Sequence, residues 1–431
     1  LDYANDTLVV SGVNTSDLVL NPLRSALRQS IGHLREGVVN AARQLTSLNQ
    51  KSPYGLSFRG MCNEVYGALA QDRPVDARFS GASAIKVMRA IDDTLALLPA
   101  TPVPAKPKGP PKPTALVIGG TGFIGRALTR KLAANGTQVR VLSRGKTGPL
   151  DDIADKVETV AVSLRDAAGL EAAMDGITDV YHLAKSEDKT WQAALENDVA
   201  VTERIANAAL NAGIKRLIYT GTIASYDLSD AGVTITEETG FGAGLEDRNI
   251  YARSKAECEA RLMAMHANKG LPITIARPGI VVGAGGPLQH WGIGRWHGAG
   301  AVKIWGHGRN MLPFVLIDDV VDGMILMAAS EGAIGQSFNL IGDPMLSARG
   351  YFDEIHKTLG ARIKVSSGQL NLLYASDAMK FFLKTKVLRR RCLSRPSLRD
   401  WKSRAHFSPF DNTKAKEMLG WSPETDKNTF I

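Results

Sequence analysis

The stretch "YARSK", residues 251–255, places a phenol and an ammonium four residues apart. In a helix, side chains at positions i and i+4 lie on one face, so Lys255 can stand beside Tyr251. A free tyrosine has a pKa of about 10, and a neighbouring cation stabilises the phenolate and lowers that pKa. The pair therefore predicts proton exchange with a hydroxyl group by general acid–base catalysis. Taken alone, such a pair is more typical of a solvated helix face, so the catalytic interpretation depends on the motifs that surround it.

A glycine-rich turn, "GGTGFIG" at residues 119–125, satisfies both the GxGxxG and the GxxGxxG spacing. It follows the apolar run "ALVI" and opens a helical segment, the context in which a dinucleotide pyrophosphate binds at a helix N-terminus. Glycines allow the tight turn and the close approach of the phosphates. The alternative is a plain strand–helix turn. The predicted phosphate-binding residues are Gly119, Thr121, Gly122, Phe123, Ile124 and Gly125.

The strand after this turn ends in "VRVLSRG", where Ser143 and Arg144 occupy the tip. An acidic residue there would bind the ribose 2′-hydroxyl of NAD, whereas an arginine accommodates the 2′-phosphate of NADP. The sequence therefore favours NADP over NAD as the cofactor. The alternative for Arg144 is a solvated charge at the end of a strand.

Strand-like and helix-like segments alternate from residue 115 onward, beginning with the strands "ALVI", "VRVLS", "VETVAVSL", "DVYHLA" and "RLIYT". This βαβα order predicts an α/β fold of the Rossmann type, a doubly wound parallel sheet. We expect one NAD(P)-binding domain over residues 115–431, with a small substrate-binding region in its C-terminal part.

A proline-rich stretch at residues 99–114 contains seven prolines and predicts an extended linker. It separates residues 1–98, where a strand is expected at 6–13 and helices at 22–46, 52–76 and 81–98. This first unit, an expected α+β unit, resembles the tail of the substrate-side domain of the glucose–fructose oxidoreductase/inositol dehydrogenase family through "SPYG" and the two helices that follow. The resemblance implies a partial copy with a structural or docking role.

Seven ordered segments carry a second, more specific resemblance, to the extended short-chain dehydrogenase/reductases of the epimerase/dehydratase family. It covers about residues 115–425 and rests on "GGTGFIG", "DVYHLA", "RLIYTGTIASY", "YARSK", "ARPGIVVGAGG", "LPFVLIDDV" and "DNTKAKEMLGW". The resemblance implies that Thr222 holds the substrate oxygen and that Tyr251 exchanges its proton. Lys255 would tune Tyr251 and hold the nicotinamide ribose.

The same resemblance assigns further cofactor contacts, from the adenine end to the nicotinamide. Its implied positions are Ser163 and Leu164 near the adenine, Leu183 and Ala184 beside the ribose, Thr220 beneath the nicotinamide, and Pro278 at the start of a loop that contacts the carboxamide. His182 is expected to be a structural residue at a strand end.

Departures from the family pattern narrow the chemistry. Family dehydratases place an Asp-Glu pair directly after the threonine, and here Ile223 and Ala224 stand there, so 4,6-dehydration is not expected. Leu312 occupies the position of an arginine that binds the diphosphate of nucleotide sugars, with Arg309 three residues earlier. This weakens the nucleotide-sugar assignment.

These residues together predict an NAD(P)-dependent epimerase or dehydrogenase that acts by hydride transfer at a secondary alcohol or ketone carbon. The first substrate hypothesis is a nucleotide- or lipid-linked sugar, as in nucleotide-sugar metabolism. The second is a sterol-, terpenoid- or flavonol-like ketone, acted on by an NADP-dependent reductase. A different class, a non-catalytic NADP-binding sensor or scaffold, would be expected to lack the Thr, Tyr or Lys.

Composition and charge limit the partners of this 431-residue chain, whose net charge is +9. Residues 380–404 hold ten Lys or Arg against one Asp, but no nucleic-acid-binding motif accompanies them, so we expect no nucleic-acid partner. No apolar run is long enough for a transmembrane helix and no signal peptide is visible. Cys62, Cys258 and Cys392 are expected to be free thiols. The sequence thus predicts a cytoplasmic protein, and a homodimer is an open alternative to a monomer.

Two further segments have a distinctive composition, and the first of them falls in the substrate-side region. Residues 289–308 are rich in Trp, His and Gly and offer aromatic faces for a ring, while the spacing of His290, His297 and His307 predicts no metal site. Residues 370–391 combine an apolar and a basic face. We expect a helix packed on the domain with its basic face exposed; the alternative is peripheral membrane contact through residues 370–404.

Overall fold

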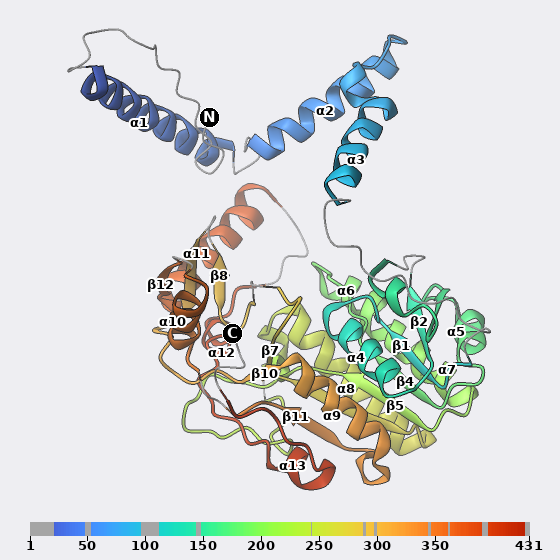
Figure 1. Cartoon of the computed structure of the whole chain (residues 1–431). Helices are drawn as coiled ribbons and strands as arrows, with labels where there is room; N and C mark the ends of the chain where they lie inside the picture. Colours follow the sequence, from blue (N-terminus) through green and yellow to red (C-terminus); the bar gives the residue numbers. More distant parts are fainter. Residues whose placement is uncertain are drawn as a thin grey trace. The chain divides into compact units, whose positions relative to one another are not determined.

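The structure is a computed structural model that describes residues 21–47, 53–95, 112–143, 148–242, 244–287, 290–296, 300–343, 346–360, 363–389 and 395–426. The chain divides into two compact units, Leu1–Pro102 and Val103–Ile431 (Figure 1). Most of the proline-rich stretch and the strand expected at residues 6–13 lie outside the described residues.

The described part of the first unit is helical. It contains α1 (Asn21–Ser47), α2 (Pro53–Ala70) and α3 (Gly81–Leu95). Asp76 caps the short turn before α3 by accepting a hydrogen bond from the Arg78 amide at 2.9 Å. Ala68 is the only buried hydrophobic residue described in this unit, so its helices expose most of their apolar side chains. Cys62 in α2 is a free thiol, as is Cys258 of the second unit, whereas Cys392 lies outside the described residues.

The second unit is built on one parallel sheet of seven strands in the order β11-β6-β5-β4-β1-β2-β3. The strands are β1 (Ala115–Ile118), β2 (Val139–Ser143), β3 (Val157–Ala161), β4 (Asp179–His182), β5 (Arg216–Thr220), β6 (Ile273–Pro278) and β11 (Ser337–Leu340). The strand order reverses direction between β1 and β4, which leaves a crevice at the carboxyl edge where cofactors bind in such sheets. The α/β, doubly wound fold predicted from the sequence is confirmed.

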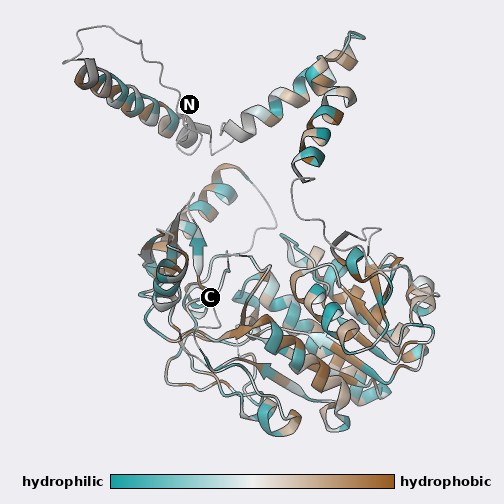
Figure 2. Ribbon diagram, viewed as in Figure 1, coloured by the Kyte–Doolittle hydropathy of each residue, from teal (hydrophilic) through white to brown (hydrophobic). Residues whose placement is uncertain are grey.

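Helices cover both faces of this sheet because its strands are apolar on both sides (Figure 2). In β1, Val117 belongs to the core that packs under α4 and α9, and Leu116 belongs to the core on the opposite face. The first face carries α4 (Phe123–Ala134), α9 (Ile317–Ala329) and α13 (Thr413–Leu419), and the second carries α5 (Ala167–Ala173), α7 (Ala200–Asn211) and α8 (Ile250–Lys269). The short helix α6 (Trp191–Ala194) continues through a π-helical turn, Leu195–Val199, into α7.

Smaller elements form the C-terminal region, where the sequence predicts substrate binding. Strands β7 (Ile280–Val282) and β10 (Phe314–Leu316) pair in parallel, and β8 (Gly294–Trp296), β9 (Ala301–Trp305) and β12 (Lys364–Gly368) form a second small sheet. Helices α10 (Ala348–Leu359), α11 (Leu370–Phe382) and α12 (Leu398–Ser403) complete the region. Their core includes Ile304, Phe314 and Phe352.

Candidate active site

The glycine turn follows β1 and leads directly into α4, as the sequence predicted. Gly119 has a φ of +93°, and a Cβ at this position would lie 2.9 Å from the amide nitrogen of Ala184. A Cβ on Gly125 would overlap the carbonyl oxygen of Gly119. Both positions therefore require glycine, the first for its backbone conformation and the second for close packing of the helix on the turn.

The start of α4 has the features of a phosphate-binding helix terminus. Gly122 is the N-cap and makes no side-chain capping hydrogen bond, so the amides of the first turn face outward uncapped. Thr121, Phe123 and Ile124 are half-buried around it. Uncapped amides at the positive end of a helix dipole fit the pyrophosphate of NAD(P).

The end of β4 adjoins this turn, whereas Ser163 and Leu164 follow β3 at the edge of the sheet. Leu183 and Ala184, expected beside the cofactor ribose, are half-buried, and Ala184 is the residue against which Gly119 packs. Ser163 is exposed and accepts a hydrogen bond from the Arg165 amide, and Leu164 is half-buried against the second core. Arg144, on which the NADP preference depends, lies outside the described residues.

His182 ends β4 and has the contacts expected of a structural residue. Its Nε2 lies 3.1 Å from the hydroxyl of Thr202, and its ring meets Tyr219 edge to face. Burial, followed by the charge of Lys255, lowers the pKa of His182 to about 3. The imidazole is therefore neutral at physiological pH.

Thr222 and Tyr251 come together just beyond the carboxyl end of β5. Thr222 is buried and caps the turn Ile223–Ser225 by accepting a hydrogen bond from the Ala224 amide at 3.2 Å. Tyr251 lies in the first turn of α8, whose N-cap Asn249 accepts a hydrogen bond from the Ala252 amide. The side chain of Thr222 lies close enough to the Tyr251 phenol to lower its pKa, while the Tyr251 ring is 39% exposed. The two hydroxyls thus lie near one another, where a substrate oxygen can approach both.

Lys255 is fully buried one turn further along α8, but its ammonium does not contact Tyr251. Nζ donates hydrogen bonds to the hydroxyl of Tyr219 at 3.2 Å and to the carbonyl of Thr220 at 3.1 Å. The cation that faces Tyr251 is Lys185, whose Nζ lies 5.4 Å from the centre of the phenol ring. Lys255 was expected to lie beside Tyr251 and lower its pKa. In the structure its ammonium is bound instead to two residues of β5, Tyr219 and Thr220.

Opposing influences act on the Tyr251 hydroxyl. Burial raises the pKa of Tyr251, whereas the nearby side chain of Thr222 and the charge of Lys185 lower it, and the net direction is upward. The phenol is thus protonated at neutral pH and is placed to give its proton to an oxygen that gains negative charge. Removal of a proton from an alcohol requires the phenolate, which Lys185 stabilises.

One buried hydroxyl near this pair has no partner. Thr220 ends β5, and in the part of the chain that the structure describes its Oγ1 is buried without a hydrogen bond. Pro278, at the end of β6, is buried and lies opposite Leu340 of β11. An unpartnered hydroxyl at this strand end, together with the glycine turn, fits a site that would hold a nicotinamide cofactor.

A buried ion pair between Arg277 and Glu259, which the sequence did not indicate, lies near Thr222 and α8. Arg277 donates hydrogen bonds from Nε and Nη2 to Glu259 Oε2 at 2.9 and 2.7 Å, and both residues are buried. Glu259 lies two turns after Tyr251 on α8, and its Oε1 packs so closely on Gly221 that a Cβ at this glycine would overlap it. The pair therefore links α8, β6 and the segment that leads into Thr222.

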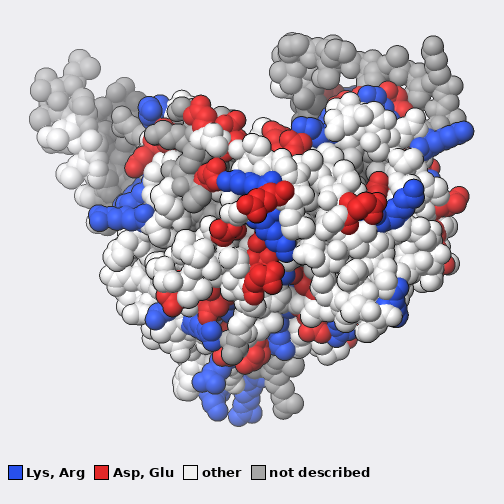
Figure 3. All heavy atoms as spheres, turned by 90° about the horizontal axis from the view of Figure 1, so that it is seen from below, with Lys and Arg blue, Asp and Glu red and all other residues white. Residues whose placement is uncertain are grey.

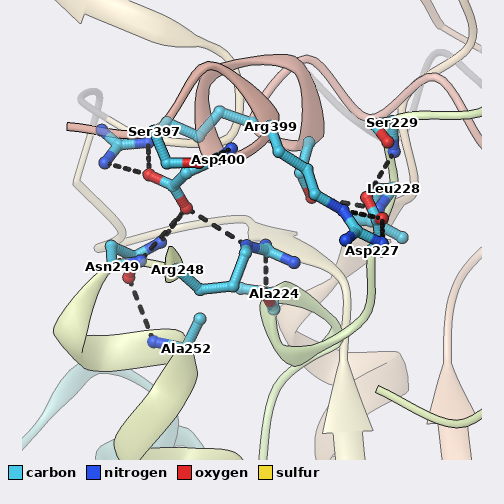
Figure 4. A network of polar contacts seen from close by, with 12 residues as sticks. Ala224, Asp227, Leu228, Ser229, Arg248, Asn249, Ala252, Ser397, Arg399 and Asp400 are labelled. Atoms are coloured by element: carbon cyan, nitrogen blue, oxygen red, sulfur yellow. Dashed lines mark hydrogen bonds and ion pairs between the residues drawn. The ribbon is translucent and has the colours of Figure 1, made fainter. Parts of the chain in front are cut away.

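A second network links α8 to the basic C-terminal segment (Figure 4). Arg248 donates to the carbonyls of Tyr226 and Ala224 at 2.6 and 2.8 Å, and its Nε lies 3.2 Å from Asp400. Asp400, in α12, also accepts hydrogen bonds from the backbone and side chain of Asn249, each at 3.1 Å. The network thus joins Asn249, the N-cap of α8 two residues before Tyr251, to the turn after Thr222 and to α12. No sequence signal pointed to it.

The aromatic segment expected on the substrate side contributes a ladder of tryptophans. Trp291 is 58% exposed and stacks on Trp305 at 6.5 Å between ring centres, and Trp305 meets Trp401 edge to face at 5.3 Å. Burial and the charge of Lys185 lower the pKa of the neighbouring His290 to about 4. No group of three metal-binding side chains occurs among the described residues, which exclude His297.

Leu312 is the residue that the family resemblance places where nucleotide-sugar enzymes bind the diphosphate, and it is an apolar core residue. Leu312 is 3% exposed and packs in the apolar core of the C-terminal region. Arg309 is exposed. Ile223 and Ala224 form the turn after Thr222, without the carboxylates that a dehydratase uses there.

This chain is similar to a protein family, to individual proteins and to solved structures of the epimerase/dehydratase type. A profile of the NAD dependent epimerase/dehydratase family matches residues 115–340. Sterol demethylase protein B of Methylococcus capsulatus is 28% identical to this chain, over 53% of this chain and 70% of its own length. UDP-glucose 4-epimerase of Mycolicibacterium smegmatis is 27% identical, over 72% of this chain and 93% of its own length. A similar solved structure is that of UDP-glucuronic acid 4-epimerase from Bacillus cereus in complex with UDP-glucuronic acid and NAD. Its TM-score is 0.56 and its sequence identity 18%, and the match covers 73% of this chain and 96% of that one. At this identity the similarity concerns the fold.

Proposed function

Because the chain belongs to the NAD dependent epimerase/dehydratase family, we propose that it transfers a hydride between NAD(P) and a secondary alcohol or ketone carbon. The observation that carries this proposal is the proximity of Thr222 and Tyr251 beyond the carboxyl end of β5, on the same edge of the parallel sheet as the glycine turn that follows β1. When bound, the cofactor accepts or supplies the hydride; all other steps belong to the protein.

The protein's own residues position and protonate the substrate oxygen. Thr222 donates a hydrogen bond to this oxygen, and Tyr251 gives it a proton during reduction or takes one during oxidation. Lys185 stabilises the phenolate that oxidation requires, since its ammonium faces the ring. Lys255, held by Tyr219 and Thr220, fixes the strand end and the ribose side of the cofactor site.

Two substrate classes fit the neighbouring surface. A nucleotide- or lipid-linked sugar is the first, supported by the relatedness to UDP-glucose 4-epimerase. A sterol-like ketone is the second, and the exposed face of Trp291 together with the buried Leu312 favours it, because a flat apolar ring stacks on indole and needs no diphosphate site. An epimerase returns the hydride to the opposite face of the same carbon, whereas a dehydrogenase releases both products.

The test of this function compares Tyr251→Phe with Tyr351→Phe, a change that removes a hydroxyl from the core around Phe314 instead of the site. UDP-glucose, UDP-glucuronic acid and a 3β-hydroxysteroid serve as probes with NAD⁺ and NADP⁺, and turnover is followed by nicotinamide absorbance and product analysis. We expect Tyr251→Phe to lose at least about a hundredfold in turnover, the range of one general acid–base group, while cofactor affinity is retained. Equal turnover in both variants would favour a non-catalytic cofactor-binding protein.

A further inference from the structure

Helix α11 and the π-helical turn Leu383–Val387 that follows it present large apolar side chains to solvent. The exposed fractions are 64% for Leu372, 65% for Met379, 58% for Phe382, 47% for Leu383, 64% for Val387 and 50% for Leu388. We call these residues the α11 patch. So many large apolar side chains exposed within 17 consecutive residues mark an interaction surface rather than ordinary surface composition.

The opposite face of the same helix is already packed. Leu370, Leu373 and Tyr374 lie against the cluster formed by Trp305, Trp401 and Ala405. The helix is therefore anchored to the domain, and the α11 patch is a second apolar face. The sequence led us to expect an exposed basic face here; the exposed face is both apolar and basic.

Cations border the patch. Between residues 370 and 389 the sequence contains Lys380, Lys384, Lys386 and Arg389 against the single acidic residue Asp377, and Arg390 and Arg391 follow directly. Over the middle of the face shown in Figure 3, Lys and Arg side chains are interspersed with Asp and Glu. An apolar surface with a one-signed basic border is complementary to an anionic, apolar partner.

We propose that the α11 patch binds the surface of a membrane containing anionic lipids, with helix α11 lying in the plane of the interface. Leu372, Met379 and Phe382 enter the boundary between headgroups and acyl chains, and the lysines extend to lipid phosphates. Since none of the described helices is long and apolar enough to cross a bilayer, the contact is peripheral.

The charge of the chain argues for lipid over two other occupants. A second copy would bring the same basic border against this one and be repelled. Helix α1 of the first unit also exposes apolar residues, among them Leu27 and Leu34, but its sequence carries four arginines against one glutamate. Only an anionic surface complements the border of the α11 patch.

The experiment measures sedimentation of the full chain with vesicles of phosphatidylcholine alone or mixed with phosphatidylglycerol. The test variant combines Leu372→Ser, Met379→Ser and Phe382→Ser. The matched control combines Val233→Ser, Leu359→Ser and Met418→Ser, which are exposed to similar degrees at scattered sites elsewhere in the second unit. Circular dichroism verifies that each variant is folded.

We expect the wild type to bind the anionic vesicles, the test variant to bind at least about tenfold more weakly, and the control to bind like the wild type. Replacing Lys380, Lys384 and Lys386 with Gln should remove most of the preference for the anionic lipid. The proposal is overturned if the wild type ignores anionic vesicles or if the test variant binds as well as the wild type. It is equally overturned if the test variant only converts a dimer to a monomer, because the patch is then a subunit interface. None of these readouts depends on catalytic activity.

Discussion

Replacement of Lys185 by Met should change the pH dependence of alcohol oxidation. Lys185 is the cation closest to the Tyr251 ring among the described contacts, and it lowers the pKa of this phenol. Without it, a smaller fraction of Tyr251 is ionised at any pH below its pKa. Since oxidation requires the phenolate to take the hydroxyl proton, its rate falls with that fraction.

The size of the effect follows from the geometry. The Lys185 ammonium lies 5.4 Å from the centre of the ring over which a phenolate delocalises part of its charge. Two unit charges separated by about this distance interact by about 0.8 kcal/mol in a solvent-like dielectric. That dielectric is appropriate because the Lys185 side chain is 52% exposed. An energy of about 0.8 kcal/mol corresponds to about a fourfold change in the ionised fraction, and thus in kcat/KM for oxidation near neutral pH.

The assay is the pH profile of kcat/KM for the alcohol that the probe set identifies, measured for wild type, Lys185→Met and the control Lys189→Met. Lys189 is an exposed residue of the same loop. The difference between wild type and Lys185→Met should be about fourfold at neutral pH and should vanish as pH rises through the pKa of Tyr251. A loss of the same size at every pH would refute this reasoning, because Lys185 would then act on the substrate and not on the phenol.

Three other substitutions test the supporting structure. Gly125→Ala should abolish measurable NAD(P) binding in a titration, because its Cβ overlaps the turn, whereas Gly240→Ala, at an open position, should bind normally. Asp400→Asn should lower the free energy of unfolding by about 3 kcal/mol in urea at neutral pH, since it leaves Arg248 buried without its charged partner. Although burial raises the pKa of Asp400, its arginine partners outweigh this and hold the pKa below the ordinary value, so the difference between wild type and variant should shrink as the pH falls through it. If Arg144 binds the 2′-phosphate as the sequence predicts, Arg144→Asp should weaken NADP⁺ binding relative to NAD⁺ by at least about tenfold in the same titration.

The sequence predicted the structure correctly where local patterns determine it. The alternation of apolar segments predicted the strands around the glycine turn, and the glycine spacing predicted the backbone that Gly119 and Gly125 adopt. The family resemblance singled out Thr222 and Tyr251, which the structure brings together. These features depend on residues that are neighbours in the chain or on landmarks in a fixed order.

Contacts between distant residues could not be read from the sequence. Arg248 and Asp400 are 152 positions apart, and nothing local marks them as partners. Lys185 approaches Tyr251 only because the loop after β4 passes over α8, and Lys255 turns away because Tyr219 and Thr220 offer its ammonium two acceptors. The rotation of α11 likewise depends on how Leu373 and Tyr374 pack on Trp401, so the apolar content of its exposed face emerged only in three dimensions.

Deuterium tracing of the cofactor hydride tests the central proposal most directly. The protein is incubated with NAD(P)H carrying deuterium at the transferable position and with the ketone form of the active probe, and the alcohol product is examined by mass spectrometry. Direct hydride transfer beside Tyr251 predicts deuterium at the carbinol carbon of the product. Alcohol that forms without the label, or label that appears in water, would contradict it.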